Sequence, residues 1–175
     1  MKRITLKDFR WLRKPDTFEK NHRQVTLEVD HSMRLPQGPL LLAISDEPFI
    51  MKASLSVPDP NAFCGVCVYH LDSTYVAAGL SQDMLELQSS IHNNRVTSKI
   101  PFTCEQKEAR WYLQRCGANM EIGLLGKEDQ KATVFTSFTL APAEDSISFG
   151  FYFSNETAEK KNMRLHSLSY TLILA

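Results

Sequence analysis

The fold is decided by the stretch FIMKASLSV (49–57), in which apolar and polar residues alternate before a Pro-Asp-Pro turn. Further apolar runs follow it: GVCVYHL (65–71), TYVAAGLS (74–81), ARWYLQRC (109–116), SISFGFYFS (146–154) and LHSLSYTLIL (165–174). Short strands at this spacing, with no helical periodicity between them, indicate an antiparallel sandwich or barrel. We therefore predict an all-β chain that forms a two-sheet antiparallel jelly roll.

Outward from this stretch, alternation and turn residues predict eleven or twelve strands. Those that can be bounded lie at 23–30, 49–57, 63–70, 74–81, 84–91, 95–100, 108–116, 119–125, 134–140, 146–154 and 163–174. Hairpin turns are expected at 71–73, 92–94 and 117–118, because Asp, Asn and Gly suit turn geometry. Within 9–20, Pro15 is expected to end any regular element, and the two prolines and the glycine of 34–42 predict a loop that leads into a short apolar piece. The segment 155–162 is expected to be a short helical turn or a loop.

Length and charge restrict the class of protein. At 175 residues we expect one domain, residues 1–175. Twenty basic residues balance twenty acidic ones, so neither nucleic acid nor an anionic membrane surface is an expected partner. No apolar stretch resembles a secretory signal or spans a bilayer, and a cytoplasmic location is therefore expected.

The cysteines lie in or beside apolar strands: Cys64, Cys67, Cys104 and Cys116. Cys64 and Cys67 are three residues apart, so in a strand their thiols would point to opposite faces. A zinc site would require His70, Cys104 or Cys116 to converge on this pair, and a redox motif would require a helix N-terminus. We predict structural thiols, with no metal and no cofactor.

Some of these segments resemble a known superfamily. FCGVCVYHLDSTYVAAGLS (63–81) resembles a signature of concanavalin A-like lectin/glucanase sandwiches, in which an Asp marks the hairpin and the second strand ends in Gly-Leu. ARWYLQRCGANMEIGLL (109–125) looks like the following hairpin, while SISFGFYFSN (146–155) and LHSLSYTLI (165–173) are similar to later strands. FRWLRKP (9–15) resembles the opening of a bacterial branch of uncharacterised function, the regulation-of-enolase-like and β-xylosidase C-terminal-like sandwiches. The resemblance implies a concanavalin A-like fold.

No catalytic residue is predicted. Glycoside hydrolysis needs two carboxylates across the scissile bond. The nearest match to the acidic strand of laminarinase-like enzymes is Glu28-Val29-Asp30, which lacks the final Glu and indicates the solvent face of a strand. The five histidines are scattered, and no Ser, His and acid set or glycine-rich phosphate loop is present in the sequence.

Binding residues are predicted from strand alternation. Sugars stack on aromatic rings and hydrogen-bond to amide, carboxylate and guanidinium groups. If Trp111 and Leu113 face the core, their neighbours face outward, and the same argument applies to the strand at 63–70. The candidate ligand-binding residues are Tyr69, Gln88, Arg110, Tyr112, Gln114 and Glu121, with Glu86 as a further member of the polar face.

The first hypothesis is a non-catalytic, carbohydrate-binding-like module whose partner is an oligosaccharide. One alternative is a glycoside-processing hydrolase with an unrecognised acid pair, which Glu28 or Asp30 close to Glu86 or Glu121 would favour. Another is a homodimeric structural or interaction protein that associates through a sheet face or the segment 9–15. That alternative expects Phe9, Trp11 and Phe18 to be exposed.

Overall fold

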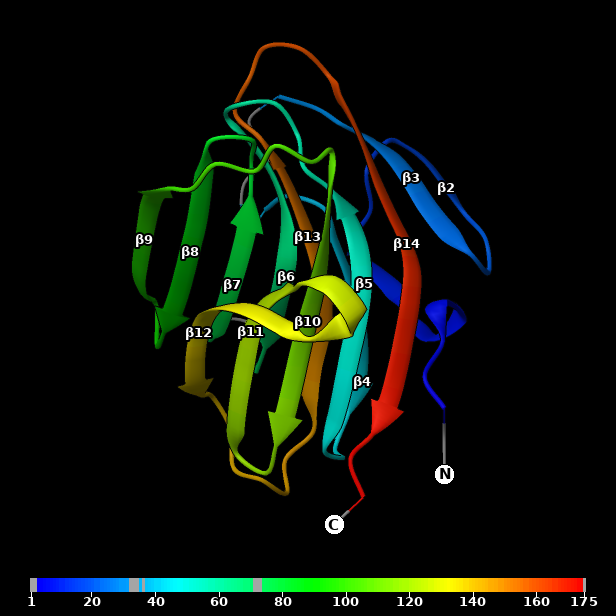
Figure 1. Ribbon diagram of the computed structural model, residues 1–175, viewed down its shortest axis with the longest axis vertical. Coiled ribbons are helices and arrows are strands. Elements are labelled where there is room, and N and C mark those ends of the chain that lie inside the picture. Colours follow the sequence, from blue (N-terminus) through cyan, green and yellow to red (C-terminus); the bar gives the residue numbers. More distant parts are fainter. Residues whose placement is uncertain (1–2, 32–34, 36, 71–73, 175) are drawn as a thin grey trace.

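The computed structural model describes residues 3–31, 35, 37–70 and 74–174, which form two antiparallel seven-stranded sheets packed face to face (Figure 1). Sheet A has the order β1 (Arg10–Arg13), β4 (Leu40–Ser45), β13 (Ile147–Asn155), β6 (Ala62–Tyr69), β7 (Tyr75–Leu80), β8 (Met84–Ile91) and β9 (Asn94–Pro101). Sheet B has the order β12 (Lys131–Thr139), β11 (Asn119–Leu125), β10 (Glu108–Cys116), β5 (Phe49–Ser56), β14 (Lys161–Leu172), β3 (Gln24–Val29) and β2 (Thr17–Lys20). The two helical elements described are 3-10 turns, η1 (Leu6–Asp8) and η2 (Lys127–Asp129). The predicted all-β, two-sheet antiparallel jelly roll is confirmed.

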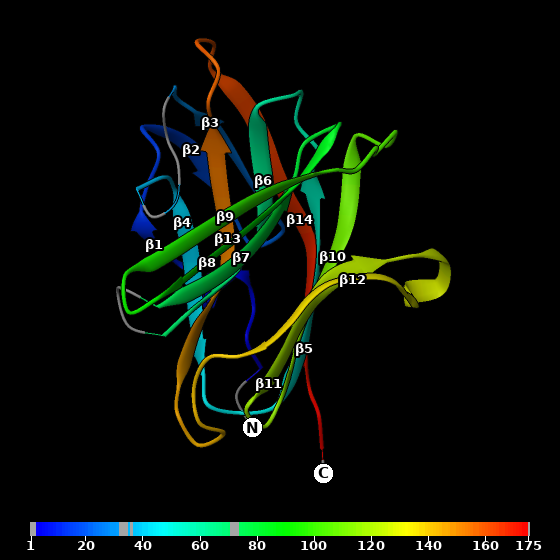
Figure 2. The same cartoon turned by 90° about the vertical axis from the view of Figure 1, so that its left-hand side faces the viewer.

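The core lies between the sheets because each strand turns one set of alternate residues inward. Figure 2 shows the two layers edge-on. Trp111 and Leu113 of β10 and Val66 and Val68 of β6 are buried in this core, as the alternation predicted. Their neighbours along each strand point away from the opposite sheet, to what we call the outer face. Each sheet therefore has one core face and one outer face.

Two short strands were not predicted. No strand was expected within 9–20, where Pro15 was predicted to end any regular element, but this segment contains β1 and β2, whereas β4 begins in the short apolar piece that was expected after the loop at 34–42. Each of β1 and β2 is four residues long, and Pro15 separates them without preventing the pairing of β1 with β4 and of β2 with β3. Strands this short carry too little alternation to be recognised, and tertiary pairing defines them.

The predicted turns agree with the structure where it describes them. His92 and Asn93 both have positive φ, 50° and 67°, between β8 and β9, and Gly117 has φ 61° between β10 and β11. The hairpin expected at 71–73 lies outside the described residues, although β6 and β7 pair as antiparallel neighbours. The segment 155–162 begins in β13 and ends in β14, and a bend without helix joins these strands.

The expected exposure of the N-terminal aromatic residues was wrong in part. Phe9 is fully buried, with its ring centroid 5.8 Å from that of Phe149, because the chain after η1 enters the core before β1 begins. Trp11 is half-buried and lies against Phe18, of which 39% is exposed. Among the residues described, no helix has the length and apolar character needed to cross a membrane.

Candidate functional site

Polar side chains gather on the outer face of sheet A. The strand register sets residues of β6, β7 and β8 side by side in three rows: Tyr69–Tyr75–Ser90, Cys67–Ala77–Gln88 and Gly65–Gly79–Glu86. Cross-strand neighbours on one face are within contact distance, so these rows form one continuous surface. Tyr69 and Tyr75 stack with ring centroids 5.0 Å apart.

At the centre of this surface, Tyr152 of β13 lies across Gly79 and reaches Glu86. A Cβ on Gly79 would lie 2.1 Å from the Tyr152 hydroxyl oxygen, so the glycine is what admits the ring. The Tyr152 hydroxyl donates a hydrogen bond to Oε1 of Glu86 at 3.3 Å, and Gln88 Nε2 donates to the same oxygen. The result is a tyrosine–glycine–glutamate arrangement that is removed from solvent, with Tyr152 0% and Glu86 3% exposed.

The Glu86 carboxyl is poorly compensated for its burial. Burial raises the pKa of Glu86, and the carboxylate of Glu156 adds to this effect, while the Gln88 hydrogen bond and the Lys99 ammonium oppose it. Lys99 is engaged elsewhere, because its Nζ lies 3.0 Å from Oε2 of Glu156 and 5.4 Å from the Phe63 ring centroid. Burial disfavours a charged carboxylate, so the protonated form of Glu86 is favoured relative to an exposed glutamate.

Three buried polar atoms beside this arrangement lack a well-formed hydrogen bond among the described residues, although Arg13 lies close enough to the Tyr69 hydroxyl to act on its pKa as a hydrogen-bond donor. They are the Tyr69 hydroxyl, Oγ of Ser154 and Nη2 of Arg13. Tyr69 is 6% and Ser154 2% exposed, and burial without a partner costs a polar group about 1–3 kcal/mol. Such groups in a native structure require an explanation, and a ligand that supplies their partners is one.

Burial of a polar group alone does not mark a site, as Arg115 shows. Its guanidinium is 1% exposed, yet it donates to backbone carbonyl oxygens only: those of Ser45, Gly117, Pro142, Ala143 and Asp145. Arg115 therefore fastens the loops at one end of the sandwich. A buried hydroxyl without a partner, that of Ser154, is what we use to mark the outer face of sheet A, because Arg110 Nε on sheet B, which also lacks a well-formed hydrogen bond, has the Asp129 carboxylate 2.9 Å away.

The outer face of sheet B repeats the same local arrangement. Tyr112 lies across Gly123, whose Cβ would meet the Tyr112 hydroxyl at 2.9 Å, and the hydroxyl donates to Oε1 of Glu121 at 2.6 Å. Here an ammonium is present: Lys131 Nζ lies 2.8 Å from the same carboxylate oxygen and 5.1 Å from the Tyr112 ring centroid. The hydrogen bonds from Lys131 and Tyr112 lower the pKa of Glu121.

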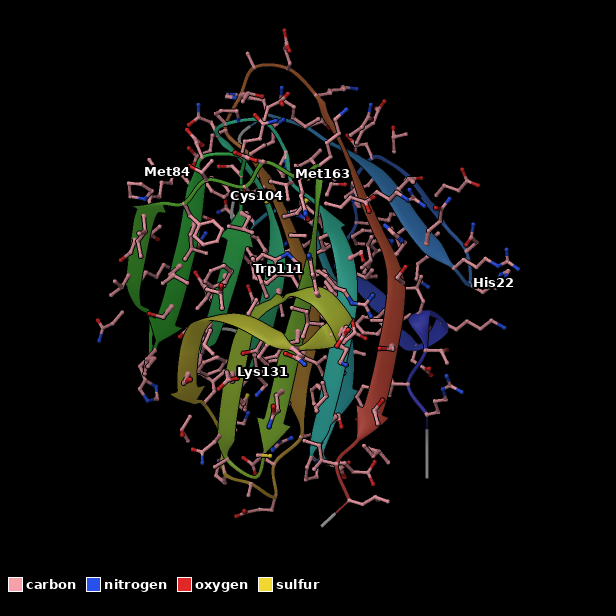
Figure 3. The ribbon with its side chains drawn as sticks, in the orientation of Figure 1. His22, Met84, Cys104, Trp111, Lys131 and Met163 are labelled. Carbon is pink, nitrogen blue, oxygen red and sulfur yellow. The ribbon has the colours of Figure 1, made fainter. Side chains whose placement is uncertain are left out.

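The segment that joins β11 to β12 covers this second arrangement. In Figure 1 it crosses over β10 as a yellow ribbon, and Figure 3 labels Lys131 on it. Asp129 from this segment pairs with Arg110, at 2.9 Å between Nε and Oδ1, and with Lys52, at 3.6 Å. The charged side chains on this face of sheet B therefore form ion pairs with one another. Gln114 and Glu121 also line a neighbouring hollow of about 320 Å³.

The structure thus divides the six predicted binding residues between two opposite faces. Tyr69 and Gln88 lie on the outer face of sheet A. Arg110, Tyr112, Gln114 and Glu121 lie together on the outer face of sheet B. Sequence reasoning did not single out Tyr152 and Ser154, although alternation along SISFGFYFSN places them on one face.

The acidic residues of the hydrolase hypothesis do not come together. Glu28 and Asp30 lie at the end of β3, where both face Lys160. Four strand spacings separate β3 from β11, so Glu28 and Glu121 are about 19 Å apart or more, and Glu86 is in the other sheet.

The cysteine pair is split as predicted. Cys64 belongs to the core between the sheets and Cys67 to the apolar cluster on the outer face of sheet A. Burial raises the pKa of both thiols. Within the described ranges, no group of three or more His, Cys, Asp or Glu residues could hold a metal ion.

Comparison with known proteins identifies solved structures that have the same fold as this chain. No protein-family model matches the chain, and no curated protein matches it. Among solved structures, the chain is similar to a functionally unknown protein from Saccharomyces cerevisiae, with a TM-score of 0.82 and 14% identity, over 98% of this chain and 100% of that one. At this identity the likeness shows the fold alone.

Two glycoside hydrolase structures contain the same fold as a part. The GH43 protein BlXynB of Bacillus licheniformis matches over 98% of this chain and 38% of its own, with a TM-score of 0.75 and 9% identity. The xylan β-1,4-xylosidase of Bacillus halodurans matches over 89% of this chain and 38% of its own, with a TM-score of 0.67 and 11% identity. The chain therefore spans little more than a third of these enzymes. It is a β-sandwich of a kind that occurs as one module within carbohydrate-active proteins.

Proposed function

We propose that the protein is a non-catalytic, carbohydrate-binding-like module that contacts its ligand with the outer face of sheet A. The observation that carries this proposal is the group of buried polar side chains beside the Glu86–Gln88 pair: Ser154, whose Oγ has no hydrogen-bond partner among the described residues, and Tyr69 with Arg13. On the outer face of sheet B, the charged groups of the matching arrangement already have partners.

The chemistry of this face suits a polyhydroxylated ligand. A saccharide hydroxyl both donates and accepts, so it can donate to a carboxylate or an amide oxygen and accept from a guanidinium or a phenol. Gln88 and Glu86 supply acceptors, and Arg13 supplies donors. Protonation of Glu86 would add a further donor.

The similar solved structures support the relation to carbohydrate-active proteins, but not a particular ligand. The GH43 protein of Bacillus licheniformis and the xylosidase of Bacillus halodurans carry the same sandwich over 38% of their length, and the name of the second describes an enzyme of xylan. We propose that this chain belongs to the concanavalin A-like superfamily, in the branch with regulation-of-enolase-like and β-xylosidase C-terminal-like sandwiches. The ligand class that we infer is an oligosaccharide.

The test is a thermal-shift screen against mono- and oligosaccharides, because a ligand that binds the folded state alone raises the melting temperature by mass action. Tyr69→Phe keeps the ring and removes only the hydroxyl, and Gln88→Ala removes an amide from the same face. Gln114→Ala, on the outer face of sheet B, is the matched control. We expect a sugar-dependent shift that the first two variants reduce and the control retains. A shift lost only in Gln114→Ala, or no shift with any sugar, would overturn the proposal.

A glycoside hydrolase remains a second candidate because of one observation. Glu86 has a raised pKa caused by burial, as a general acid requires, and the electrostatic influence of Glu156 reaches it. Release of sugar from aryl glycosides that Glu86→Gln abolishes would favour this candidate over a binding module.

Self-association is a third candidate. Every residue of the edge strand β9 is exposed, including Val96 and Ile100, so its free backbone groups could pair with a second chain. A mass that rises with concentration, and falls after Val96→Lys, would favour this candidate.

A further inference from the structure

A groove of about 690 Å³ lies beside β14, apart from the outer face of sheet A. Its walls come from residues 3–6, from the turn between β2 and β3, and from the middle of β14. Figure 3 labels His22 on that turn, at the tip of the hairpin. The lining residues are Arg3, Ile4, Thr5, Leu6, Asn21, His22, Arg23, Gln24, Arg164, His166, Ser167, Leu168, Ser169 and Tyr170. Pockets that bind small molecules have volumes of this order.

The groove is cationic although the chain as a whole is neutral. Three guanidinium groups line it, those of Arg3, Arg23 and Arg164, and none of the described lining residues is Asp or Glu. One carboxylate that comes near is Glu108, whose Oε1 lies 3.8 Å from Nη1 of Arg164 and whose Oε2 lies 2.8 Å from Nε2 of His166. A second carboxylate, that of Asp8, accepts a hydrogen bond from the backbone N–H of the lining residue Thr5 at 2.8 Å, so two carboxylates lie near the three arginines.

The backbone and side chains that present these cations are fixed in place. Asn21 Oδ1 accepts hydrogen bonds from the backbone N–H groups of Arg23, at 2.8 Å, and Gln24, at 3.0 Å, which holds the hairpin turn. The Gln24 side chain in turn accepts from Nε of Arg164 at 3.1 Å. The backbone of Arg23 and the side chain of Arg164 are thus both held by hydrogen bonds, which reduces the ordering that a ligand must impose at these two points.

The floor of the groove adds a hydroxyl and apolar surface. The register of β14 shifts between His166 and Ser169, and Ser167 has φ 54° at this bulge. Its hydroxyl lies 2.8 Å from Nδ1 of His166. Ile4 and Leu6, both less than 10% exposed, form the apolar part. Charge–charge attraction is stronger beside such a low-dielectric surface than in open water.

We propose that this groove binds a small molecule through a tetrahedral oxyanion, a phosphate or a sulfate group. Guanidinium groups form paired hydrogen bonds with the oxygens of such anions, and the imidazole N–H of His22, which also lines the groove, extends the set of donors. The site is separate from the proposed sugar-binding face and shares no element with its central residues. Failure of either proposal therefore leaves the other standing.

The experiment is an amide NMR titration of the full chain with inorganic phosphate and with sulfate, at constant ionic strength set by chloride. We expect saturable shifts at Arg23, Arg164 and Ser167, and about tenfold weaker affinity in Arg23→Gln, because charge-assisted hydrogen bonds are lost. Lys127→Gln, an exposed charge change on η2, is the matched control and should bind as the wild type does. Acetate, a planar carboxylate, should bind more weakly than phosphate.

Two substitutions at Arg164 separate the effect of the planar guanidinium geometry from the effect of its positive charge. Arg164→Lys keeps the positive charge but loses the planar fork, so its phosphate affinity should lie between those of the wild type and Arg164→Gln. Both variants change an exposed side chain, and melting temperatures would confirm that they fold. Shifts that do not saturate, that chloride reproduces, or that Arg23→Gln and Lys127→Gln change equally would overturn the proposal.

Discussion

The two outer faces carry the same local arrangement with opposite electrostatics. In sheet A, Tyr152 lies across Gly79 and donates to Glu86, and in sheet B, Tyr112 lies across Gly123 and donates to Glu121. Burial raises the pKa of Glu86, whereas the hydrogen bonds of Lys131 and Tyr112 lower the pKa of Glu121.

The difference comes from what the rest of the chain brings to each face. The first residue of β12, Lys131, pairs with Glu121, which gives that carboxylate a counter-charge. The strand next to β8 supplies Lys99, but this ammonium pairs with Glu156. A sheet face with satisfied charges needs no ligand. The outer face of sheet A has a buried carboxylate and, on Ser154, a buried hydroxyl without a partner among the described residues, which is the reason for proposing that a ligand binds there.

The largest contrast expected between the faces is in thiol reactivity. Cys67 is buried on the outer face of sheet A, and burial raises its pKa, while Cys116 is exposed at the end of β10. We expect iodoacetamide to label Cys116 at least about a thousandfold faster than Cys67, whose reaction needs local opening. Peptide mass spectrometry over time measures both rates, with core-facing Cys64 as the protected reference. Equal labelling of Cys67 and Cys116 would show that the face is open.

The next largest effect is expected on the unfolding free energy when Gly79, which lies under the Tyr152 ring, is replaced. Gly79→Ala would place a Cβ 2.1 Å from the Tyr152 hydroxyl oxygen in a fully buried position, and such overpacking costs about 1–3 kcal/mol of unfolding free energy. Urea denaturation measures it. Gly126→Ala, where the nearest atom is 3.1 Å away and the surroundings are exposed, should cost less. An equal loss in both variants would contradict the packing described for Tyr152.

Removal of the buried charge should stabilise the protein. Because the pKa of Glu86 is raised in the folded state, its contribution to stability is present below the unfolded-state pKa and is lost as pH rises through the folded-state pKa. Glu86→Gln should therefore gain about 1 kcal/mol at neutral pH, and the gain should vanish in acid. Denaturation at a series of pH values tests this. A variant less stable than the wild type at neutral pH would refute the assignment of an uncompensated carboxylate.

The corresponding Glu-to-Gln substitution on the outer face of sheet B should change the stability by a smaller amount and in the opposite direction. Since the pKa of Glu121 is lowered in the folded state, its contribution is present above the unfolded-state pKa and is lost as pH falls through the folded-state pKa. Glu121→Gln should lose about 0.5 kcal/mol at neutral pH, as expected for a partly exposed ion pair, and salt should reduce the loss. An unchanged stability in low salt would mean that Lys131 gives no net stabilisation.

The sequence predicted which residues share a strand face better than it predicted which strands share a sheet. Alternation placed Trp111 and Leu113 in the core and Tyr69 outside it. It could not show that the strand of Tyr69 and that of Tyr112 belong to opposite sheets, because sheet membership depends on pairing between distant segments, such as β13 with β6.

The candidate site was accordingly predicted in part. Tyr69 and Gln88 were named, whereas Tyr152 and Ser154 were hidden in the continuous apolar run of β13. Their contribution became evident only when that strand paired between β4 and β6.

The most direct test of this account is a carbon-13 NMR titration of the Glu86 and Glu121 carboxyl groups, with and without a sugar found by the screen. The account predicts that Glu86 titrates above and Glu121 below the ordinary value of a glutamate, and that the sugar shifts only Glu86. Two carboxyl groups that titrate alike, or a sugar that shifts Glu121 and leaves Glu86 unchanged, would contradict it.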